Sequence, residues 1–383
     1  MTDFGDLSRR NLLRVAAAAT AGVAAAGAAT LAAAVPPVRE RRTTALTGRA
    51  WELAPPYGID SLRLVQVEVP QPSAGEVLMR VRATGLNARD RTIVKGSFRQ
   101  KQVPPGFVPL ADNAGEVVAV GEGVTHVVPG DRVLCIHYPR WEDGRWHISR
   151  ADLDLGASAS GFLRDYAVVP ASGVTRIPAS LGWLEACTLP VAGVTAWRAL
   201  REMANLAPGE TMLTLGTGGV SVFGLQIAKM LGARVAITSS SDEKLERMRA
   251  LGADFTFNYR SNPKWGSEVL ERTGGVDVVM DNAGPASLDQ TLAACASAAR
   301  VVFIGMVGGF AQTAALPQMM MRNLSISSMS NASRRMMEDF VRAIDANGLK
   351  PLVGRSFSFD QAKEAFHYFD SSPDRVGNIV IEI

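Results

Sequence analysis

The fold of this chain is decided by a glycine-rich stretch that reads Leu213-Thr214-Leu215-Gly216-Thr217-Gly218-Gly219-Val220-Ser221. The apolar run before it (211–215) predicts a buried strand, and residues 220–231 predict a helix. This order of strand, glycine turn and helix is typical of a dinucleotide site, with GxGxxS in place of GxGxxG. The first two glycines allow a tight turn and a close approach to a pyrophosphate, and the helix start offers free N–H groups. We expect the cofactor to bind Gly216, Thr217, Gly218, Gly219 and Val220.

The residues after this stretch repeat the pattern of buried strand and helix. Apolar runs at 234–238, 276–280 and 300–304 predict further strands. A helix is expected over 242–251, with Ser241 as its N-cap. Continuous apolar strands that alternate with helices indicate a parallel, doubly wound sheet, which is an α/β fold.

The end of the second strand indicates which dinucleotide binds. A site for NAD usually has an acidic residue here, which binds the ribose 2′-hydroxyl. This chain has Ser239 and Ser240, and Lys244 follows one helical turn later. Serine hydroxyls and an ammonium group can bind a 2′-phosphate, so we expect NADP as the cofactor. The alternative is that the serines are loop and capping residues and the lysine is solvated.

The preceding part of the chain has a different pattern. Short runs that alternate apolar and polar residues, separated by turn residues, occur at 61–69, 76–83, 114–121 and 131–136. Strands of this length and spacing are typical of a small twisted barrel or sandwich.

Four stretches together resemble the medium-chain dehydrogenase/reductase superfamily over residues 47–383. They are Gly85-Leu86-Asn87-Ala88-Arg89-Asp90, residues 117–121 with Gly130-Asp131-Arg132-Val133, the glycine-rich stretch, and Arg375-Val376-Gly377-Asn378-Ile379-Val380. The resemblance implies a GroES-like β-barrel catalytic domain (47–188, completed by 331–383) and a Rossmann domain (189–330). It also implies a homodimer.

The chain departs from the zinc-dependent members of that family. At the three positions where those members place zinc ligands, it has Asn87, Ala111 and Ala192, so we expect no metal. It is similar to the zinc-independent quinone and enone reductases, which implies hydride transfer from NADPH to an electron-poor small molecule, a quinone or an α,β-unsaturated carbonyl. Two alternatives are a zinc-free alcohol or aldehyde oxidoreductase and a non-catalytic NADPH-binding redox sensor.

The resemblance also implies roles for individual residues. Asn87, Asp90 and Thr195 are expected at the catalytic centre, although a turn asparagine, a structural aspartate and a capping threonine are alternatives. Further cofactor contacts are expected from Tyr259, Asn282, Gly305, Met306 and Asn378.

The proton donor and the acceptor pocket are less well defined. Candidate proton donors are Tyr138 and Tyr166. The loop 138–160, with Trp141, Trp146 and His147, is expected at the rim of the acceptor pocket, or else packs on the domain surface. The four histidines show no metal-ligand spacing, and we expect surface or hydrogen-bonded roles for them.

Composition and the N-terminus limit location and partners. The net charge is +3 with no dense basic tract, so nucleic acid is not an expected partner, and three scattered cysteines argue against a disulfide framework. Residues 1–34 carry Arg9-Arg10, an alanine-rich apolar run and small residues before Pro36, which resembles a twin-arginine export signal. A linker (35–46) follows. We expect export to the periplasm or another extracytoplasmic space, with contact to a membrane only through that signal; the alternative is a cytoplasmic enzyme.

Overall fold

A parallel sheet lies at the centre of the C-terminal half of the chain. The computed structural model describes residues 45–99, 101–305 and 316–383. Within these ranges six strands pair in the order β12-β11-β10-β13-β14-β15, and every pair is parallel. Their bounds are β10 (Thr211–Leu215), β11 (Arg234–Ser239), β12 (Phe255–Asn258), β13 (Val276–Asp281), β14 (Cys295–Phe303) and β15 (Ser325–Ser328). This order, 3-2-1-4-5-6, defines a Rossmann sheet, so the predicted α/β class is confirmed.

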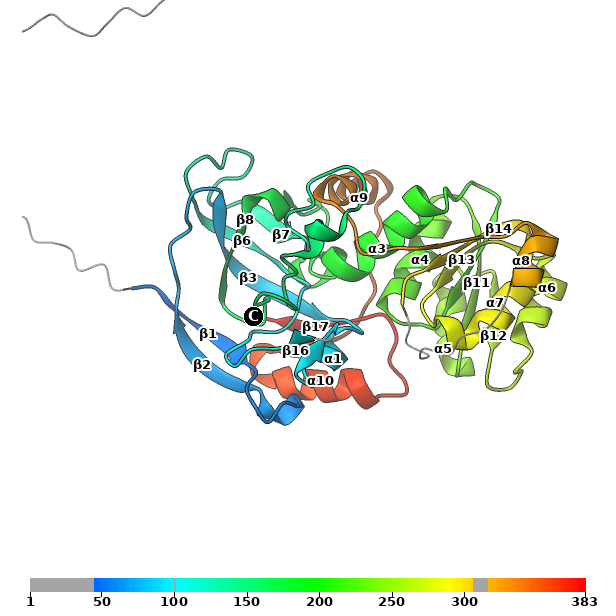
Figure 1. Ribbon diagram of the computed structural model, residues 1–383, viewed down its shortest axis with the longest axis horizontal. Coiled ribbons are helices and arrows are strands. Elements are labelled where there is room, and N and C mark those ends of the chain that lie inside the picture. The colour runs from blue at the N-terminus through cyan, green and yellow to red at the C-terminus, as the bar shows by residue number, and fades with distance from the viewer. Residues whose placement is uncertain (1–44, 100, 306–315) are drawn as a thin grey trace, which may run out of the picture. The chain divides into compact units, whose positions relative to one another are not determined.

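Both faces of this sheet are buried, which explains why its strands are apolar without alternation. Met212 and Met280 contact one core cluster, together with Phe223 from α4. Leu213 and Val279 contact the other, which contains Trp265 from α6. The helices that pack on this sheet or beside it (Figure 1) are α3 (Val194–Arg198), α4 (Gly219–Met230), α5 (Asp242–Ala250), α6 (Trp265–Thr273), α7 (Leu288–Ala294) and α8 (Leu316–Arg322). The helix α2 (Trp183–Ala186) contacts strands of the N-terminal half, and α9 (Arg334–Asn347) packs against α3. Two π-helical segments, Leu189–Gly193 and Ala199–Met203, flank α3.

The N-terminal half forms a mainly antiparallel barrel-like sheet. The strand order in the described chain is β16-β17-β3-β6-β7-β9, and β8 also pairs with β3. The strands are β3 (Glu76–Leu86), β6 (Ala114–Val120), β7 (Arg132–Cys135), β8 (Tyr166–Pro170), β9 (Val174–Arg176), β16 (Val353–Ser358) and β17 (Asn378–Glu382). Smaller pairs are formed by β1 (Thr47–Glu52) with β2 (Arg63–Glu68) and by β4 (Ser97–Phe98) with β5 (Lys101–Gln102). The helix α1 (Asp90–Ile93) follows β3.

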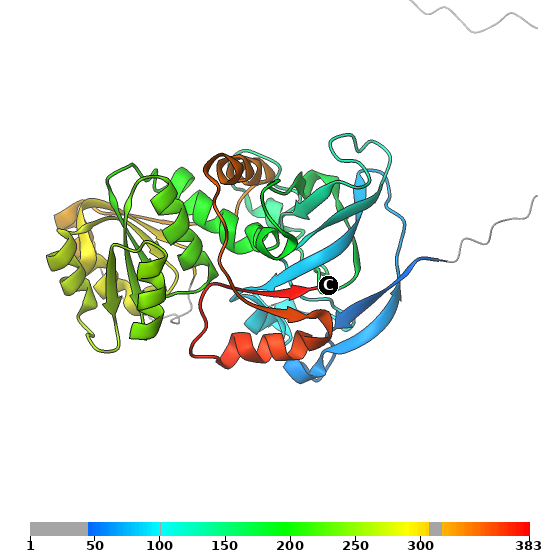
Figure 2. The same ribbon diagram turned by 180° about the vertical axis from the view of Figure 1, so that it is seen from behind.

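The C-terminal residues return to this barrel after the Rossmann sheet. The strand β17 pairs with β3, and α10 (Ala362–Ser371) packs against β16 and β17 (Figure 2). The helix α9 contacts both α3 and β9. Short 3-10 turns cover Ile59–Ser61, Ile148–Ala151, Ala171–Gly173, Pro285–Ser287 and Phe359–Gln361. The segment that follows the Rossmann sheet therefore contacts both halves of the chain.

Two element boundaries differ from the sequence prediction. The strand β14 begins at Cys295, five residues before the expected start, because small residues (Ala296 to Ala299) gave no apolar run there. The helix α9 begins at Arg334, with the Ser333 hydroxyl accepting the Met336 N–H as a cap, although the apolar periodicity begins only at Met337. The predicted cap Ser241 is confirmed, since its side chain accepts the Lys244 N–H.

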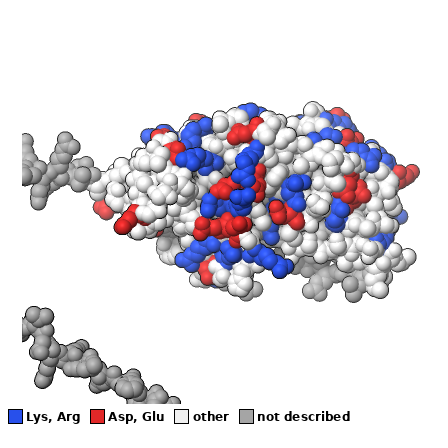
Figure 3. Space-filling view, turned by 90° about the horizontal axis from the view of Figure 1, so that it is seen from above, with Lys and Arg blue, Asp and Glu red and all other residues white. Residues whose placement is uncertain are grey.

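The surface carries charges of both signs. On the face seen in Figure 3, basic and acidic side chains are interspersed. Among the described helices, none is long and apolar enough to cross a membrane. The predicted signal (1–34) and Met306 lie outside the described residues.

Candidate functional site

The glycine-rich stretch forms the turn between β10 and α4. Gly216 has φ +81°, a left-handed conformation that favours glycine, and its N–H donates to the Thr238 carbonyl at 3.0 Å. Gly218 is the N-cap of α4 with φ −78°. A Cβ built on either residue would have no atom within 4 Å. The backbone thus faces open space beside the N–H groups that begin α4, and this cradle fits a pyrophosphate.

The third glycine of the turn serves packing instead. A Cβ on Gly219 would collide with the Asn378 side-chain oxygen. Asn378 is buried, and its Nδ2 donates to the Leu352 carbonyl at 3.1 Å. The neighbouring Gly377 N–H donates to the Thr217 carbonyl at 2.9 Å. The start of β17 therefore contacts the glycine-rich turn, and Asn378 lies beside this turn, as the sequence predicted.

Polar groups gather at the carboxyl end of β11. The Lys244 ammonium donates to Ser240 Oγ at 3.3 Å and to the Pro373 carbonyl at 2.8 Å. Burial lowers the Lys244 pKa, and the charges of Arg375 and Arg260 lower it further. Three cations therefore lie close together with Asp374 as the one nearby carboxylate that acts on Lys244, an excess of positive charge that suits a phosphate group.

Ser239 and Tyr259 differ in accessibility at this end of the sheet. Ser239 is only 1% exposed, and its Oγ has no hydrogen-bond partner among the described residues. Its carbonyl accepts the Tyr259 N–H at 3.1 Å, and the Tyr259 ring is 41% exposed. Ser240 and Tyr259 are therefore better placed than Ser239 to meet a bound molecule.

The loops after β13 and β14 meet on the other half of the sheet. Asn282 Nδ2 donates to Ser221 Oγ at 2.9 Å, and that hydroxyl donates to the Leu215 carbonyl at 2.8 Å. A Cβ on Gly305 would lie 3.1 Å from the Asn282 carbonyl oxygen. Asn282 and Gly305 thus lie together beside the start of α4, at the carboxyl edge where ligands of such sheets bind.

The predicted catalytic Asn87 is held by two carboxyl groups. Its Nδ2 donates to Asp112 Oδ2 at 2.8 Å, and its backbone N–H donates to Asp90 Oδ2 at 2.7 Å. Asp112 Oδ1 accepts the Val191 N–H at 2.9 Å. Burial raises the pKa of Asp112 to about 8 and that of Asp90 to about 7. Asp112 therefore fixes the orientation of the Asn87 side-chain amide. Asp90 holds the Asn87 backbone instead.

Thr195 lies inside α3 and is 7% exposed. The N-cap of that helix is Gly193, so the alternative that Thr195 caps a helix is wrong. The π-helical segment that precedes α3 contains Val191, whose N–H binds Asp112, so the chain that leads to Thr195 is attached to the same carboxyl group as Asn87.

The residues at the zinc-ligand positions do not fit zinc. Asn87 uses its amide nitrogen as a donor to Asp112, and Ala111 and Ala192 carry no ligand atom. Among the residues that the structure describes, no group of three or more His, Cys, Asp or Glu side chains could hold a metal ion.

A buried polar cluster beside Asn87 was missed by the sequence analysis. Arg89, His137 and Asp154 contact one another, with Asp154 Oδ1 2.7 Å from Arg89 Nη2 and 2.9 Å from His137 Nδ1. The Arg89 and His137 charges lower the Asp154 pKa to about 2 against the effect of burial. Of the two roles expected for the histidines, His137 has the hydrogen-bonded one, since it is buried and bonded through Nδ1, while its Nε2 has no partner among the described residues.

The loop 138–160 packs partly on itself. The Trp141 ring is fully buried 4.9 Å from the Trp146 ring, and the Arg198 guanidinium lies 4.8 Å from the Trp141 ring centre. Trp141 thus packs on the domain, whereas His147 is exposed. Of the two candidate proton donors, Tyr138 lies next to His137, and Tyr166 packs against Gly48 of β1.

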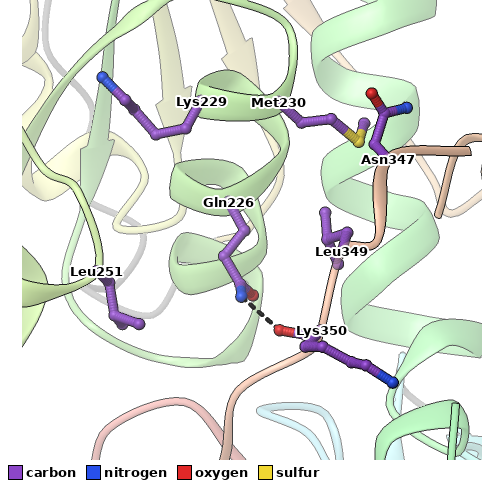
Figure 4. A pocket seen from close by; sticks show the side chains of 7 residues that line it. All are labelled: Gln226, Lys229, Met230, Leu251, Asn347, Leu349 and Lys350. Atoms are coloured by element: carbon purple, nitrogen blue, oxygen red, sulfur yellow. Dashed lines mark hydrogen bonds between the residues drawn. The ribbon is translucent and has the colours of Figure 1, made fainter. Parts of the chain in front are cut away.

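A separate cavity of about 310 Å³ lies beside the C-terminal part of α4 (Figure 4). Gln226 Nε2 donates to the Lys350 carbonyl at 2.6 Å along its wall, and Lys229 and Leu349 also line it. The glycine turn is at the opposite end of α4, so this cavity is not the dinucleotide site.

The fold and this site define a two-domain oxidoreductase that binds a pyridine nucleotide. The sequence matches the "Alcohol dehydrogenase GroES-like domain" family over residues 73–179 and the "Zinc-binding dehydrogenase" family over residues 219–346. A zinc-type alcohol dehydrogenase-like protein of Schizosaccharomyces pombe is 38% identical over 335 residues, which are 85% of this chain and 96% of the relative. The chain belongs to the medium-chain dehydrogenase/reductase superfamily.

Two further similarities span most of the chain. The acryloyl-coenzyme A reductase of Metallosphaera sedula is 28% identical over 82% of this chain and 95% of that protein. The crystal structure of a candidate alcohol dehydrogenase from Sinorhizobium meliloti 1021 is 37% identical, with a TM-score of 0.81 over 88% of this chain and 99% of that one. The similarity therefore extends over both halves of the fold.

Proposed function

We propose that this protein is a zinc-independent reductase that transfers hydride from NADPH to a quinone or an α,β-unsaturated carbonyl. The observation that carries the choice of NADPH is the basic cluster at the end of β11, where Lys244 binds Ser240 and lies near Arg260 and Arg375. A 2′-phosphate would balance these charges, whereas the 2′-hydroxyl of NADH would not.

The choice of acceptor rests on the chemistry of the Asn87 region. The dinucleotide, when bound, supplies the hydride. The side chains of Asn87, Ala111 and Ala192 cannot bind a metal ion that would stabilise an alkoxide. An electron-poor acceptor therefore suits the site better than a simple alcohol. Acryloyl-coenzyme A, the substrate in the name of one relative, is an α,β-unsaturated thioester of this kind. The buried carboxyl group of Asp112 holds the Asn87 side-chain amide and that of Asp90 holds its backbone N–H, so Asn87 is already oriented before an acceptor binds.

A zinc-free alcohol or aldehyde oxidoreductase is the second candidate. It is favoured by the alcohol dehydrogenase-like relative at 38% identity. A turnover screen of the purified protein with quinones, enones, enoyl thioesters, aldehydes and alcohols separates the two. We expect turnover on the first three classes, unchanged after treatment with a strong zinc chelator. Turnover on alcohols alone, or its loss on chelation, would contradict the proposal. Tight NADPH binding without any turnover would favour the redox-sensor alternative.

Cofactor preference is tested with Lys244→Ala. A charge-assisted hydrogen bond contributes about 1.5–3 kcal/mol, and partial solvation of this site reduces that to about 1–2 kcal/mol. We expect the Kd for NADPH to rise about tenfold and the Kd for NADH to stay within about twofold, as measured by fluorescence titration. Lys363→Ala in α10 is the matched control, because this half-buried ammonium also donates to a backbone carbonyl, that of Asp60 at 3.0 Å. Equal losses for both dinucleotides would show that Lys244 does not contact a 2′-phosphate.

A further inference from the structure

The segment that joins α10 to β17 is bonded to the nucleotide-binding half of the chain near both of its ends. This 372–377 link belongs to the barrel, because α10 packs against β16 and β17. Near its start, the Pro373 carbonyl accepts a hydrogen bond from the Lys244 ammonium at 2.8 Å. At its end, the Gly377 N–H donates to the Thr217 carbonyl at 2.9 Å. The link therefore connects the two places where the cofactor is expected to bind, the basic cluster and the glycine-rich turn.

Arg375, in the middle of this link, is a half-buried cation. Its guanidinium lies 4.1 Å from the Phe369 ring centre and donates to the Phe369 carbonyl. Among the described residues Arg375 has no ion-pair partner, and the neighbouring Asp370 is paired with Arg91 at 3.2 Å. Burial, together with the charge of Arg91, lowers the pKa of Arg375 to about 10. Because burial without a counter-ion disfavours the charged form, an anion bound beside Arg375 would stabilise this part of the link.

Lys244 and Arg375 are close enough to act on one anion. The carbonyl that Lys244 binds is two residues before Arg375 in the chain, and the charge of Arg375 lowers the Lys244 pKa. Asp374 lies between them in the chain and acts on Lys244 in the opposite direction. Its side chain is exposed, so water and salt weaken its repulsion of an anion. Together with Arg260, three cations therefore face one screened carboxylate.

An anion can bind Lys244 without displacing the link. An ammonium group has three N–H donors, and Lys244 uses two of them, for Ser240 Oγ at 3.3 Å and for the Pro373 carbonyl. A guanidinium group has five, of which Arg375 uses one on Nη1 for the Phe369 carbonyl. A phosphate group brings three acceptor oxygens and close to two negative charges at neutral pH. It therefore matches donors of both side chains that have no partner among the described residues.

We propose that the 2′-phosphate of NADPH binds Lys244 and Arg375 together and thereby fixes the 372–377 link. This inference rests on the proposed function. Because the Gly377 N–H is bonded to the glycine-rich turn, fixing the link also holds the start of β17 against that turn. NADH has no 2′-phosphate and leaves the link as it is in the ligand-free protein. Arg375 is therefore a specificity-determining residue that the catalytic domain contributes to the cofactor site.

The first test compares adenosine 2′,5′-bisphosphate with adenosine 5′-monophosphate, which differ only in the 2′-phosphate. Titration gives the Kd of each, and hydrogen exchange of the purified protein is then measured at equal occupancy. We expect the bisphosphate to slow exchange in the peptide that covers the link about tenfold more than the monophosphate does, because opening the Gly377 bond to Thr217 then also breaks contacts with the phosphate. Equal slowing by the two nucleotides, or faster exchange with the bisphosphate, would overturn the proposal.

The same measurements separate this proposal from the proposed function. Tighter binding of the bisphosphate with equal exchange would refute only the role of the link. A 2′-phosphate that does not tighten binding would refute the preference for NADPH, and the role of the link with it.

Arg375→Ala tests the residue itself. We expect its Kd for the bisphosphate to rise about tenfold, its Kd for the monophosphate to stay within about twofold, and the difference in exchange to disappear. Arg132→Ala is the matched control, since that guanidinium also donates to a carbonyl, that of Leu181 at 2.7 Å, and lies 4.4 Å from the Trp183 ring centre. It should behave like the wild type. An Arg375→Ala protein that keeps the wild-type difference would overturn the proposal, and the wild-type comparison decides alone if that variant does not fold.

Discussion

Replacing Gly218 by alanine should weaken cofactor binding without unfolding the protein. Gly218 has φ −78° and ψ 178°, which alanine adopts freely, and the added Cβ would have no atom within 4 Å. When the dinucleotide is bound, its pyrophosphate is expected to occupy this space, in close contact with the Gly218 backbone. The methyl group would therefore meet only the cofactor.

The expected magnitudes follow from this geometry. Alanine is a poorer N-cap than glycine, which lowers the free energy of unfolding by up to about 1 kcal/mol. Alanine also reduces the conformational entropy of the unfolded chain, which raises the free energy of unfolding by about 0.4–1 kcal/mol. The ligand-free protein should therefore keep its free energy of unfolding within about 1 kcal/mol. Loss of one backbone hydrogen bond to a phosphate costs about 1.5–3 kcal/mol, which raises the Kd for NADPH about ten- to 150-fold. Thermal melting of the ligand-free protein and fluorescence titration measure the two quantities.

Gly219→Ala is the matched variant, because here the methyl group would meet the protein. It would collide with the Asn378 side-chain oxygen and lie 3.4 Å from Ala192 Cβ. Asn378 can move only by giving up its bond to the Leu352 carbonyl, so the ligand-free protein should lose about 1–3 kcal/mol. The double variant Gly219→Ala with Asn378→Ala should lose less than the sum of the two single losses. The reasoning is refuted if Gly218→Ala binds NADPH like the wild type, or if it destabilises the ligand-free protein as much as Gly219→Ala does.

Two further predictions concern the buried acids and the N-terminus. Burial raises the Asp112 pKa to about 8, so between pH 4 and pH 8 the folded state keeps a proton that the unfolded state has lost, and stability falls as the pH rises through this range. Asp112→Asn should flatten that part of the curve of unfolding free energy against pH, and an unchanged slope in urea melts would contradict the assignment. We also propose export by the twin-arginine route, with cleavage near Ala34. N-terminal sequencing of protein from fractionated cells should find the shortened chain outside the cytoplasm. An intact Met1 in the cytoplasmic fraction alone would refute this proposal.

The sequence was sufficient for the parts of the molecule that depend on near neighbours in the chain. The turn from Gly216 to Gly219 is one continuous segment, and its glycines follow directly from the backbone conformations that such a turn needs. The parallel strands were predictable because burial on both faces makes each of them uniformly apolar. Asn378 was placed beside the turn only through family resemblance, since 159 residues separate it from Gly219 (378 minus 219).

The polar cluster could not be predicted in the same way. Arg89 and His137 are 48 residues apart, and Arg89 and Asp154 are 65 apart. None of the three lies in a spacing that indicates a contact, and the burial that makes the cluster informative is a property of the folded chain. A histidine directly after a buried strand was the one available signal, and it was outweighed by the absence of metal-ligand spacing.

The charges around Asn87 also bear on which acceptor the site can reduce. Arg89 carries a positive charge close to Asn87 in the chain, but Asp154 balances it at 2.7 Å, so this pair adds no net positive charge to the site. A site of neutral polar groups stabilises a developing oxyanion less than a metal ion does. An enolate or a quinol anion spreads its charge over several atoms and needs less of this stabilisation than a localised alkoxide. These electrostatics, together with the absence of zinc-binding side chains at Asn87, Ala111 and Ala192, support the proposal that the acceptor is an enone or a quinone rather than a simple aldehyde.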